Sequence, residues 1–498
     1  MDPNTAERLP VVIQGGMGVG VSAWRLARAV ARAGHLGVVS GTALDVTLAR
    51  RLQDGDVDGS ARRALAHFPL PEVAARVLDR WFRPEGRPEG KPYKPTPRPG
   101  LRPNLARDEL TVAGNFVEVW LAKEGHDGLI GINFLEKIQV ALPAAAYGAV
   151  LAGADYVLVG AGIPRLLPSL LTELSAHRPG TIQVDVTGGP AQPVTLDPAE
   201  LGAGSLAPMR RPRFLAIVSA HVLAAYLARD PFTRPDGFVV EGPSAGGHNA
   251  PPRGRLVVDE SGEPVYGPRD DANLEQIATI GLPFWLAGGY GEPGKVRAAL
   301  AAGAAGVQVG TLFALCRESG LLPPLREQLL EQLRAGTLQV RTDMAASPTG
   351  FPFKVAQIPD TMAEASVYAA RPRLCDLGYL RQAYQRPNGT VGFRCPAEPV
   401  DMFARKGGDP GGAVGSKCLC NALVANIGLG QHRADGYDEA PIITLGSDLH
   451  GARLLDAEHW LSGGSPEGWS ATDAVSWLMR EAHAPAAGTQ PVITGQAV

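Results

Sequence analysis

The sequence has no long run of apolar residues and no excess of charge of one sign. Its 47 Lys and Arg are balanced by 50 Asp and Glu among 498 residues. No apolar stretch is long enough to span a bilayer, and residues 1–10 are polar, without the apolar core of a signal peptide. These absences argue against nucleic acid and membranes as partners, and we expect a cytoplasmic protein.

Cysteine is also scarce. Five cysteines in 498 residues are too few for a secreted fold held together by disulfides. A chain of this length can bury a large core, so the sequence predicts one large domain and a smaller second part.

Short apolar runs of strand character recur along the chain, and helical patterns fill most of the gaps between them. Such βα repeats favour a parallel sheet. About eight repeats match the strand number of a (β/α)8 TIM barrel, with a doubly wound open sheet as the rival fold. The predicted strands are 11–14, 36–40, 130–135, 156–160, 214–219, 238–241, 284–289 and 306–311.

The predicted α/β barrel covers residues 8–370, with insertions at about 83–110 and 181–201, and a C-terminal extension covers 371–498. Residues 83–107 are rich in proline and basic residues, which predicts an extended segment. A solvent loop, a lid and an arm of a homo-oligomer remain alternatives for it. The second insertion reads as a small β excursion.

A glycine-rich turn follows the first strand. Its spacing, Gly15-Gly16-Met17-Gly18-Val19-Gly20, differs from a dinucleotide fingerprint, and no acidic residue ends the second strand. We therefore interpret it as backbone that approaches a flat ring. The helix that follows is predicted to start with Ser22 as its N-cap and to close at Gly34.

The sixth strand leads into the stretch Gly242-Pro243-Ser244-Ala245-Gly246-Gly247-His248. Gly246 and Gly247 have no Cβ, so their backbone can lie flat against a ligand. His248 falls just past the carboxyl end of the strand, where barrels carry their chemistry. A surface histidine in a flexible loop is the alternative.

Loops after the seventh and eighth strands of barrels often bind phosphate. Here these loops are small, with Ala287, Gly288 and Gly289 in the first and Gly310 and Thr311 in the second. The amide of Asn133, at the end of the third strand, suits a ring edge with alternating N–H and C=O groups. FMN, with a phosphate tail and a flat ring, fits this combination.

The same motifs, in the same order over roughly residues 9 to 370, resemble the nitronate monooxygenase (2-nitropropane dioxygenase) family of FMN-dependent TIM barrels. That family is related to flavin enoyl-acyl-carrier-protein reductases and to the enoyl reductases of polyunsaturated fatty acid and polyketide biosynthesis. One departure is Gly15-Gly16-Met17, where the family usually has Ala-Pro-Met. The resemblance implies that His248 is the catalytic acid or base. It implies that FMN is held by Gln14, Gly15, Gly16, Met17, Asn133, Ser219, Gly246, Gly247, Ala287, Gly288, Gly289, Gln308, Gly310 and Thr311.

The expected function is oxidation of nitronates, nitroalkanes or a related activated carbon acid with dioxygen. A histidine can take or give the proton at the reacting carbon, and the flavin carries the electrons. One alternative is an enoyl reductase that uses NAD(P)H and an acyl-carrier protein. A flavin-free isomerase or lyase and a non-catalytic scaffold with a degenerate barrel are the others.

Four cysteines, Cys375, Cys395, Cys418 and Cys420, fall in the predicted extension, whereas Cys316 lies just past the eighth strand. Four clustered thiols suggest a metal site with four cysteine ligands, for zinc or an iron–sulfur cluster. Four ordinary buried cysteines are the equal alternative.

Overall fold

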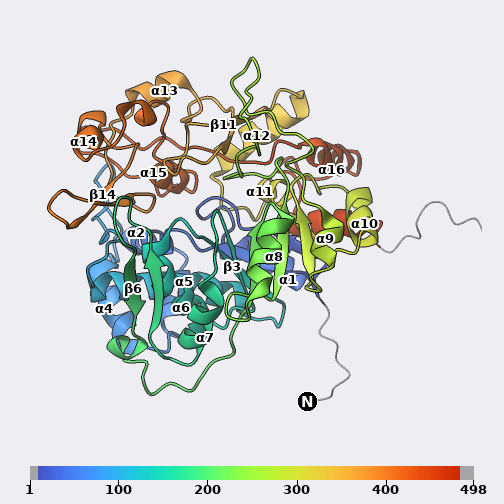
Figure 1. Ribbon diagram of the computed structural model, residues 1–498. Coiled ribbons are helices and arrows are strands. Elements are labelled where there is room, and N and C mark those ends of the chain that lie inside the picture. Colours follow the sequence, from blue (N-terminus) through green and yellow to red (C-terminus); the bar gives the residue numbers. More distant parts are fainter. Residues whose placement is uncertain (1–8, 483–498) are drawn as a thin grey trace, which may run out of the picture.

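Eight parallel strands close into a barrel in the computed structural model, which describes residues 9–482 (Figure 1). The strand order is β1-β10-β9-β8-β7-β4-β3-β2. A parallel bridge between Ile13 and Leu36 joins the two ends of this order, so the sheet has no free edge. The strands are β1 (Val12–Gln14), β2 (Gly37–Ser40), β3 (Ile130–Leu135), β4 (Tyr156–Gly160), β7 (Arg213–Val218), β8 (Gly237–Glu241), β9 (Phe284–Ala287) and β10 (Gly306–Val309). The predicted TIM barrel is confirmed, and the open sheet is excluded.

The barrel interior is filled by side chains from alternating positions of the strands. This inner cluster includes Ile13, Val38, Leu158 and Trp285, all 0% exposed. The indole N–H of Trp285 donates to the carbonyl of Pro10 at 2.7 Å, so the one polar atom of this large ring is satisfied. The interior is therefore a packed core and leaves ligand space only at the end of the barrel.

Helices between the strands form the outer layer, and a second cluster of apolar residues packs them onto the barrel. These helices are α1 (Trp24–Arg32), α2 (Leu44–Gln53), α3 (Ser60–Leu65), α4 (Pro71–Trp81), α5 (Leu105–Lys123), η1 (Gln139–Ala141), α6 (Leu142–Leu151), α7 (Leu167–Ser175), η2 (Pro198–Leu201), α8 (His221–Arg229), α9 (Leu274–Ala278), α10 (Pro293–Ala301), α11 (Thr311–Ala314) and α12 (Pro323–Ala335).

The predicted role of Ser22 as a helix cap is wrong. The N-cap of α1 is Ala23, which makes no side-chain cap hydrogen bond. The Ser22 hydroxyl instead donates to the carbonyl of Gly15 at 3.0 Å and accepts from the N–H of Met17 at 3.0 Å. This serine fixes the glycine turn after β1, a contact that helix-capping statistics cannot reveal.

The two insertions take different forms. The second contains the antiparallel hairpin of β5 (Gly180–Val184) and β6 (Gln192–Leu196), as expected from its sequence. The first has no helix or strand between α4 and α5. It is anchored to the C-terminal region, since the N–H of Tyr93 donates to Gln431 at 2.7 Å and Arg98 donates to the carbonyl of Asp376 at 3.1 Å. We name it the strap.

The C-terminal region covers one end of the barrel and also returns to its side. It contains β11 (Val340–Asp343), β12 (Phe353–Ala356), α13 (Ala365–Ala370), β13 (Gln382–Gln385), β14 (Val391–Arg394), α14 (Val400–Arg405), η3 (Pro410–Ala413), α15 (Leu419–Ala425), α16 (His450–Leu461) and α17 (Ala471–Met479). In Figure 1, α13, α14 and α15 lie above the barrel. Helix α17 packs on α1 and α10, so part of the predicted extension completes the barrel's helical layer. The division at 370 stays a prediction, and its ends before residue 9 and after 482 lie outside the described residues.

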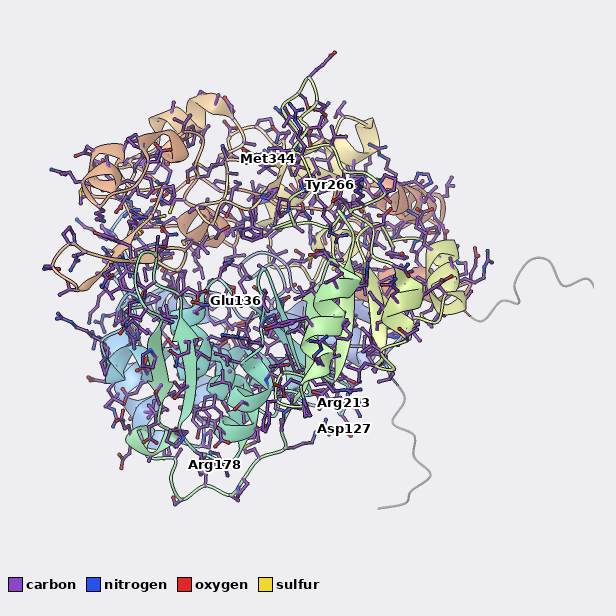
Figure 2. The ribbon with its side chains drawn as sticks, viewed as in Figure 1. Asp127, Glu136, Arg178, Arg213, Tyr266 and Met344 are labelled. Carbon is purple, nitrogen blue, oxygen red and sulfur yellow. The ribbon has the colours of Figure 1, made fainter. Side chains whose placement is uncertain are left out.

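The covered end is the one where the strands finish. Asp127 precedes β3 and lies at the lower end of the barrel, whereas Glu136 follows β3 and lies near the C-terminal layer (Figure 2). The carboxyl ends of the strands therefore face this layer. Across residues 9–482, no helix is both long and apolar enough to cross a membrane.

Candidate active site

A large cavity lies between the carboxyl ends of the strands and the C-terminal region. It encloses about 1670 Å³ of space, counting its open mouth. Thirteen of the fifteen predicted catalytic and cofactor residues line it: Gly15, Gly16, Met17, Asn133, Gly246, Gly247, His248, Ala287, Gly288, Gly289, Gln308, Gly310 and Thr311. The structure thus brings together in space motifs that lie as much as 296 residues apart in the chain, from Gly15 to Thr311.

Gln14 and Ser219 are not among the residues that line the cavity. Gln14 is 0% exposed, donates to the Ser22 hydroxyl at 2.9 Å and accepts from the N–H of Val38 at 3.0 Å. It therefore holds the glycine turn from behind. Ser219 follows β7, and its carbonyl accepts a hydrogen bond from Arg253 at 2.5 Å.

One wall of the cavity is built around amide side chains. A Cβ added at Gly16 would lie 2.3 Å from the Cβ of Asn133, so glycine is required for this close approach. Gln308 packs against Gly15, and its buried Oε1 has no hydrogen-bond partner among the described residues. A buried acceptor without a donor is costly, and an N–H group on a bound ring would satisfy it.

The loops after β9 and β10 form another part of the wall. Gly288 has φ +86°, and a Cβ there would lie 2.9 Å from the carbonyl oxygen of Gly242, so this glycine serves the packing of two loops. At Gly310 a Cβ would meet only Met17, at 3.7 Å, and would otherwise extend into open space. Gly310 is therefore the better probe of ligand space.

The same end of the cavity also holds a carboxylate. Asp448 lines it and forms a 2.8 Å ion pair with Lys295. Burial works to raise the pKa of Asp448, but hydrogen bonds from Lys295 and the N–H of His450 outweigh it and leave the pKa lowered. An anionic ligand at this end would meet a charge pair instead of a free carboxylate.

His248 is fixed on both sides. Its Nε2 lies 2.7 Å from the hydroxyl of Ser347, and its ring packs edge-on against Phe353 with ring centres 4.9 Å apart. The preceding N–H, of Gly247, donates to the hydroxyl of Thr444 at 2.8 Å. Burial lowers the pKa of His248 from 6.5 to about 4, so the imidazole is neutral near pH 7 and able to accept a proton.

Glu241 is a second titratable group in this cavity. It ends β8 and lines the cavity seven residues before His248. Burial raises its pKa from 4.5 to about 7, which is the range suited to proton transfer at neutral pH. In the sequence Glu241 was predicted only as the last residue of the sixth strand, although a carboxylate at the end of a barrel strand was the signal available.

The four cysteines of the C-terminal region also come together. Cys375, Cys395, Cys418 and Cys420 all line one small cavity. Within residues 9–482, however, no group of three or more His, Cys, Asp or Glu side chains is placed to hold a metal ion. The zinc alternative therefore finds no support in the described structure.

Fold and cavity define a (β/α)8 barrel protein with a large cavity at the carboxyl ends of its strands. Within that class, residues 212–347, a range that contains His248, match the sequence model of the nitronate monooxygenase family. The resemblance predicted from the sequence motifs is thereby confirmed.

Two curated relatives agree with this match. A nitronate monooxygenase of Pseudomonas aeruginosa is 33% identical over 190 residues, which is 38% of this chain and 47% of the relative. A protein named probable nitronate monooxygenase from Bacillus subtilis is 37% identical over 103 residues, 20% of this chain and 28% of the relative. The chain thus spans half or less of the length of these relatives.

Among solved structures, FabK from Thermotoga maritima matches with a TM-score of 0.46 at 16% identity, over 95% of this chain and 93% of that one. Nitroalkane oxidase from Streptomyces ansochromogenes matches with a TM-score of 0.44 at 16% identity, over 96% of both chains.

Proposed function

We propose that this chain is an FMN-dependent oxidoreductase of the nitronate monooxygenase type, acting on a nitronate, a nitroalkane or a related activated carbon acid with dioxygen. The observation that carries the proposal is the single cavity in which a neutral, buried His248 faces the same space as the glycine loops and Gln308. The family match over residues 212–347 supports the same chemistry.

The residues of the cavity fit FMN. The unpartnered Oε1 of Gln308 suits a ring N–H, and the open space at Gly310 suits a tail beside the β10 loop. Gly15, Gly16 and Asn133 offer a flat wall for a ring. When bound, FMN would accept the electrons that leave the substrate carbon.

The chain's own part is to bind the substrate and to move a proton. In the tautomer in which Nε2 of His248 carries the hydrogen and donates it to the Ser347 hydroxyl, Nδ1 is the proton acceptor. A neutral imidazole there can remove the acidic proton beside a nitro group. Leu380, Leu419 and Leu423 of the C-terminal region line the cavity with apolar side chains.

The test starts with an absorbance spectrum of the purified protein, followed by anaerobic additions. We expect flavin bands, bleaching by an alkyl nitronate, recovery of the bands on admission of air, and no bleaching by NADPH. Bleaching by NADPH alone would favour the enoyl reductase, and protein that cannot bind FMN would overturn the proposal.

A further inference from the structure

The four cysteines of the C-terminal region come from three separate segments. Cys375 follows α13, Cys395 follows β14, and Cys418 and Cys420 lie at the start of α15. Cys395 and Cys418 are each 6% exposed and pack together, with Cys420 against them. All four are free thiols, and Cys316, the fifth cysteine, lies apart in the core beside Phe313.

The thiols surround a space instead of meeting at a point. They line one small cavity together with Pro348, Leu380 and Arg381, among others. A structural zinc ion needs its sulfurs to converge at about 2.3 Å from one centre, and the described residues contain no such group. In an iron–sulfur cluster different irons take different thiolates, so the four sulfurs stand further apart around the cluster core.

Cationic and hydrogen-bonding groups surround the thiols. Arg381 lines the cavity, and Arg371 lies near Cys418. The side-chain amide of Asn421 donates to Sγ of Cys418 at 3.5 Å. Donors to sulfur and nearby positive charge stabilise thiolates and tune the potential of a cluster.

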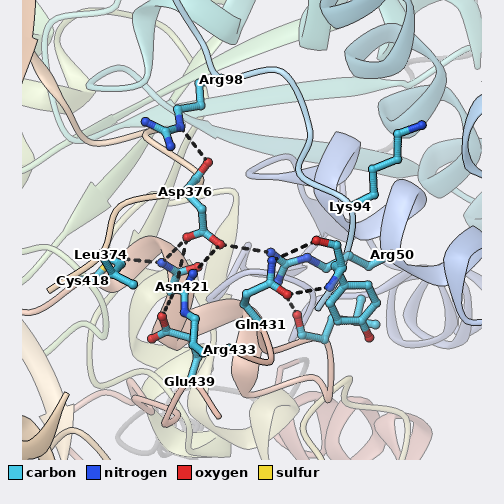
Figure 3. Close-up of polar contacts among 12 residues, drawn as sticks. Arg50, Lys94, Arg98, Leu374, Asp376, Cys418, Asn421, Gln431, Arg433 and Glu439 are labelled. Carbon is cyan, nitrogen blue, oxygen red and sulfur yellow. Dashed lines mark hydrogen bonds and ion pairs between the residues drawn. The ribbon is translucent and has the colours of Figure 1, made fainter. Parts of the chain in front are cut away.

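These partners are held in place by a buried ionic network (Figure 3). Asp376 accepts from Asn421 at 2.7 Å and pairs with Arg433 at 3.3 Å. Glu439, 0% exposed at its side chain, binds both Arg433 and Arg371, the latter at 2.9 Å. The network thus fixes Asn421 and Arg371 beside Cys418. Four ordinary core cysteines would not require such support.

We propose that Cys375, Cys395, Cys418 and Cys420 ligate an iron–sulfur cluster of the four-iron type, one thiolate to each iron. As each Fe–S bond forms, the thiol releases its proton to solvent, and no electron is transferred in this step.

The cluster site adjoins the candidate active site. Leu380, Leu419 and Cys420 line both cavities, so one thin wall separates them. Cluster binding nevertheless stands independently of the proposed function, because iron and sulfide are measured separately from flavin.

The experiment uses the full chain purified without oxygen, and the same chain reconstituted with ferric iron, sulfide and an excess of a small thiol, which reduces half of the iron to the oxidation level of the cluster. We expect about four irons and about four acid-labile sulfides per chain, and a paramagnetic signal after reduction with dithionite. Fully reduced flavin gives no such signal, so the two groups are distinguished.

Matched variants locate the ligands. Cys395→Ser and Cys418→Ser should each lower bound iron at least fivefold, whereas Cys316→Ser should leave it unchanged. Should the ligand variants fail to fold, alkylation of the native chain gives the same answer: four thiols become reactive only after iron is chelated. Zinc without sulfide, no iron after reconstitution, equal iron in Cys395→Ser and wild type, or disulfides that resist alkylation would each overturn the proposal.

Discussion

The cavity has two sides that are built in opposite ways. The floor consists of residues at the strand ends of the barrel, where small residues and backbone hydrogen bonds set the shape: 15–19, 133, 241, 244–248, 287–291 and 308–312. The roof consists of the cavity-lining residues between 379 and 452, held by buried ion pairs and by the strap. Catalytic candidates therefore sit on a rigid scaffold, whereas closure of the cavity depends on long-range side-chain contacts.

The largest effect should come from the floor. We expect His248→Ala to lower turnover of a neutral nitroalkane by about 10²–10⁴, because a positioned proton acceptor is lost. Much of that loss should vanish when the substrate is supplied as its nitronate, and flavin content should stay unchanged. Steady-state rates with both substrate forms provide the measurement.

Ser347→Ala serves as the companion variant, since it removes only the hydroxyl beside Nε2. It should change the rate far less than His248→Ala does. An equal loss with nitroalkane and nitronate in His248→Ala would mean that the imidazole orients the substrate.

Substitutions in the roof should instead lower the free energy of unfolding. Arg371→Ala leaves Glu439 buried and short of its bidentate partner, since the two side chains are 3% and 0% exposed. Breaking such a pair costs about 3–5 kcal/mol of unfolding free energy. Chemical denaturation measures it.

The matched control is Arg405→Ala, which removes an ion pair whose side chains are both 71% exposed. There we expect about 0–1 kcal/mol. Equal effects of the two substitutions would show that the buried network does not support the roof.

Glu241 allows a pH test of the floor. Its folded pKa of about 7 lies above its value of 4.5 in an unfolded chain, so the fold favours the protonated form. The associated stability is fully present below pH 4.5 and is lost as the pH rises through 7, by about 3 kcal/mol in total. In flavin-free protein, Glu241→Gln should remove this loss.

The comparison with wild type at each pH isolates Glu241, because His248 titrates in both proteins. The lowered pKa of His248 has the opposite pH dependence: its contribution to stability is lost as the pH drops from 6.5 through 4. If the unfolding free energy depended on pH identically in wild type and Glu241→Gln, the Glu241 carboxyl would be solvated and its pKa would not be raised.

The smallest expected effect concerns flavin affinity. Gly310→Val adds a side chain that meets only Met17 within the protein and otherwise occupies ligand space. We expect FMN affinity to fall at least tenfold, about 1.4 kcal/mol, with the fold unchanged. Gly267→Val, at a loop position where an added Cβ would meet nothing within 4 Å, is the control. Fluorescence titration with FMN measures both affinities. Equal FMN affinity of the two variants would contradict the placement of FMN beside Gly310.

The floor could be predicted from sequence because its signals are local. An apolar strand followed by glycines, as at 306–310, identifies both the element and the loop that faces the ligand. One local prediction failed because two structures compete for the same side chain. Serine is a common N-cap residue, but the Ser22 hydroxyl binds the carbonyl of Gly15, in the turn seven residues earlier. Gln14 and Ser219 were assigned to the ligand site by the family resemblance, and neither lines the cavity.

The roof could not be predicted because its contacts join distant segments. Tyr93 and Gln431 are hydrogen-bonded although they lie 338 residues apart in the chain. No periodicity in either segment predicts this contact. Clustering of four cysteines in sequence did suggest that they come together, but the ion pairs around them, such as Arg371 with Glu439, carry no sequence signature.

The return of α17 to the side of the barrel has a consequence for the order of folding. Trp469 donates at 2.9 Å to the carbonyl of Leu312, in α11 after β10, and Trp477 donates at 3.2 Å to the carbonyl of Gly291, in the loop after β9. The helix itself covers α1, near the beginning of the chain. A ribosome that has released all eight strands has therefore still not released the segment that seals them, so the nascent barrel exposes apolar surface until residues 469–479 have emerged. A chain that stops just before residue 469 would lack both tryptophans and leave the apolar side chains beneath them exposed.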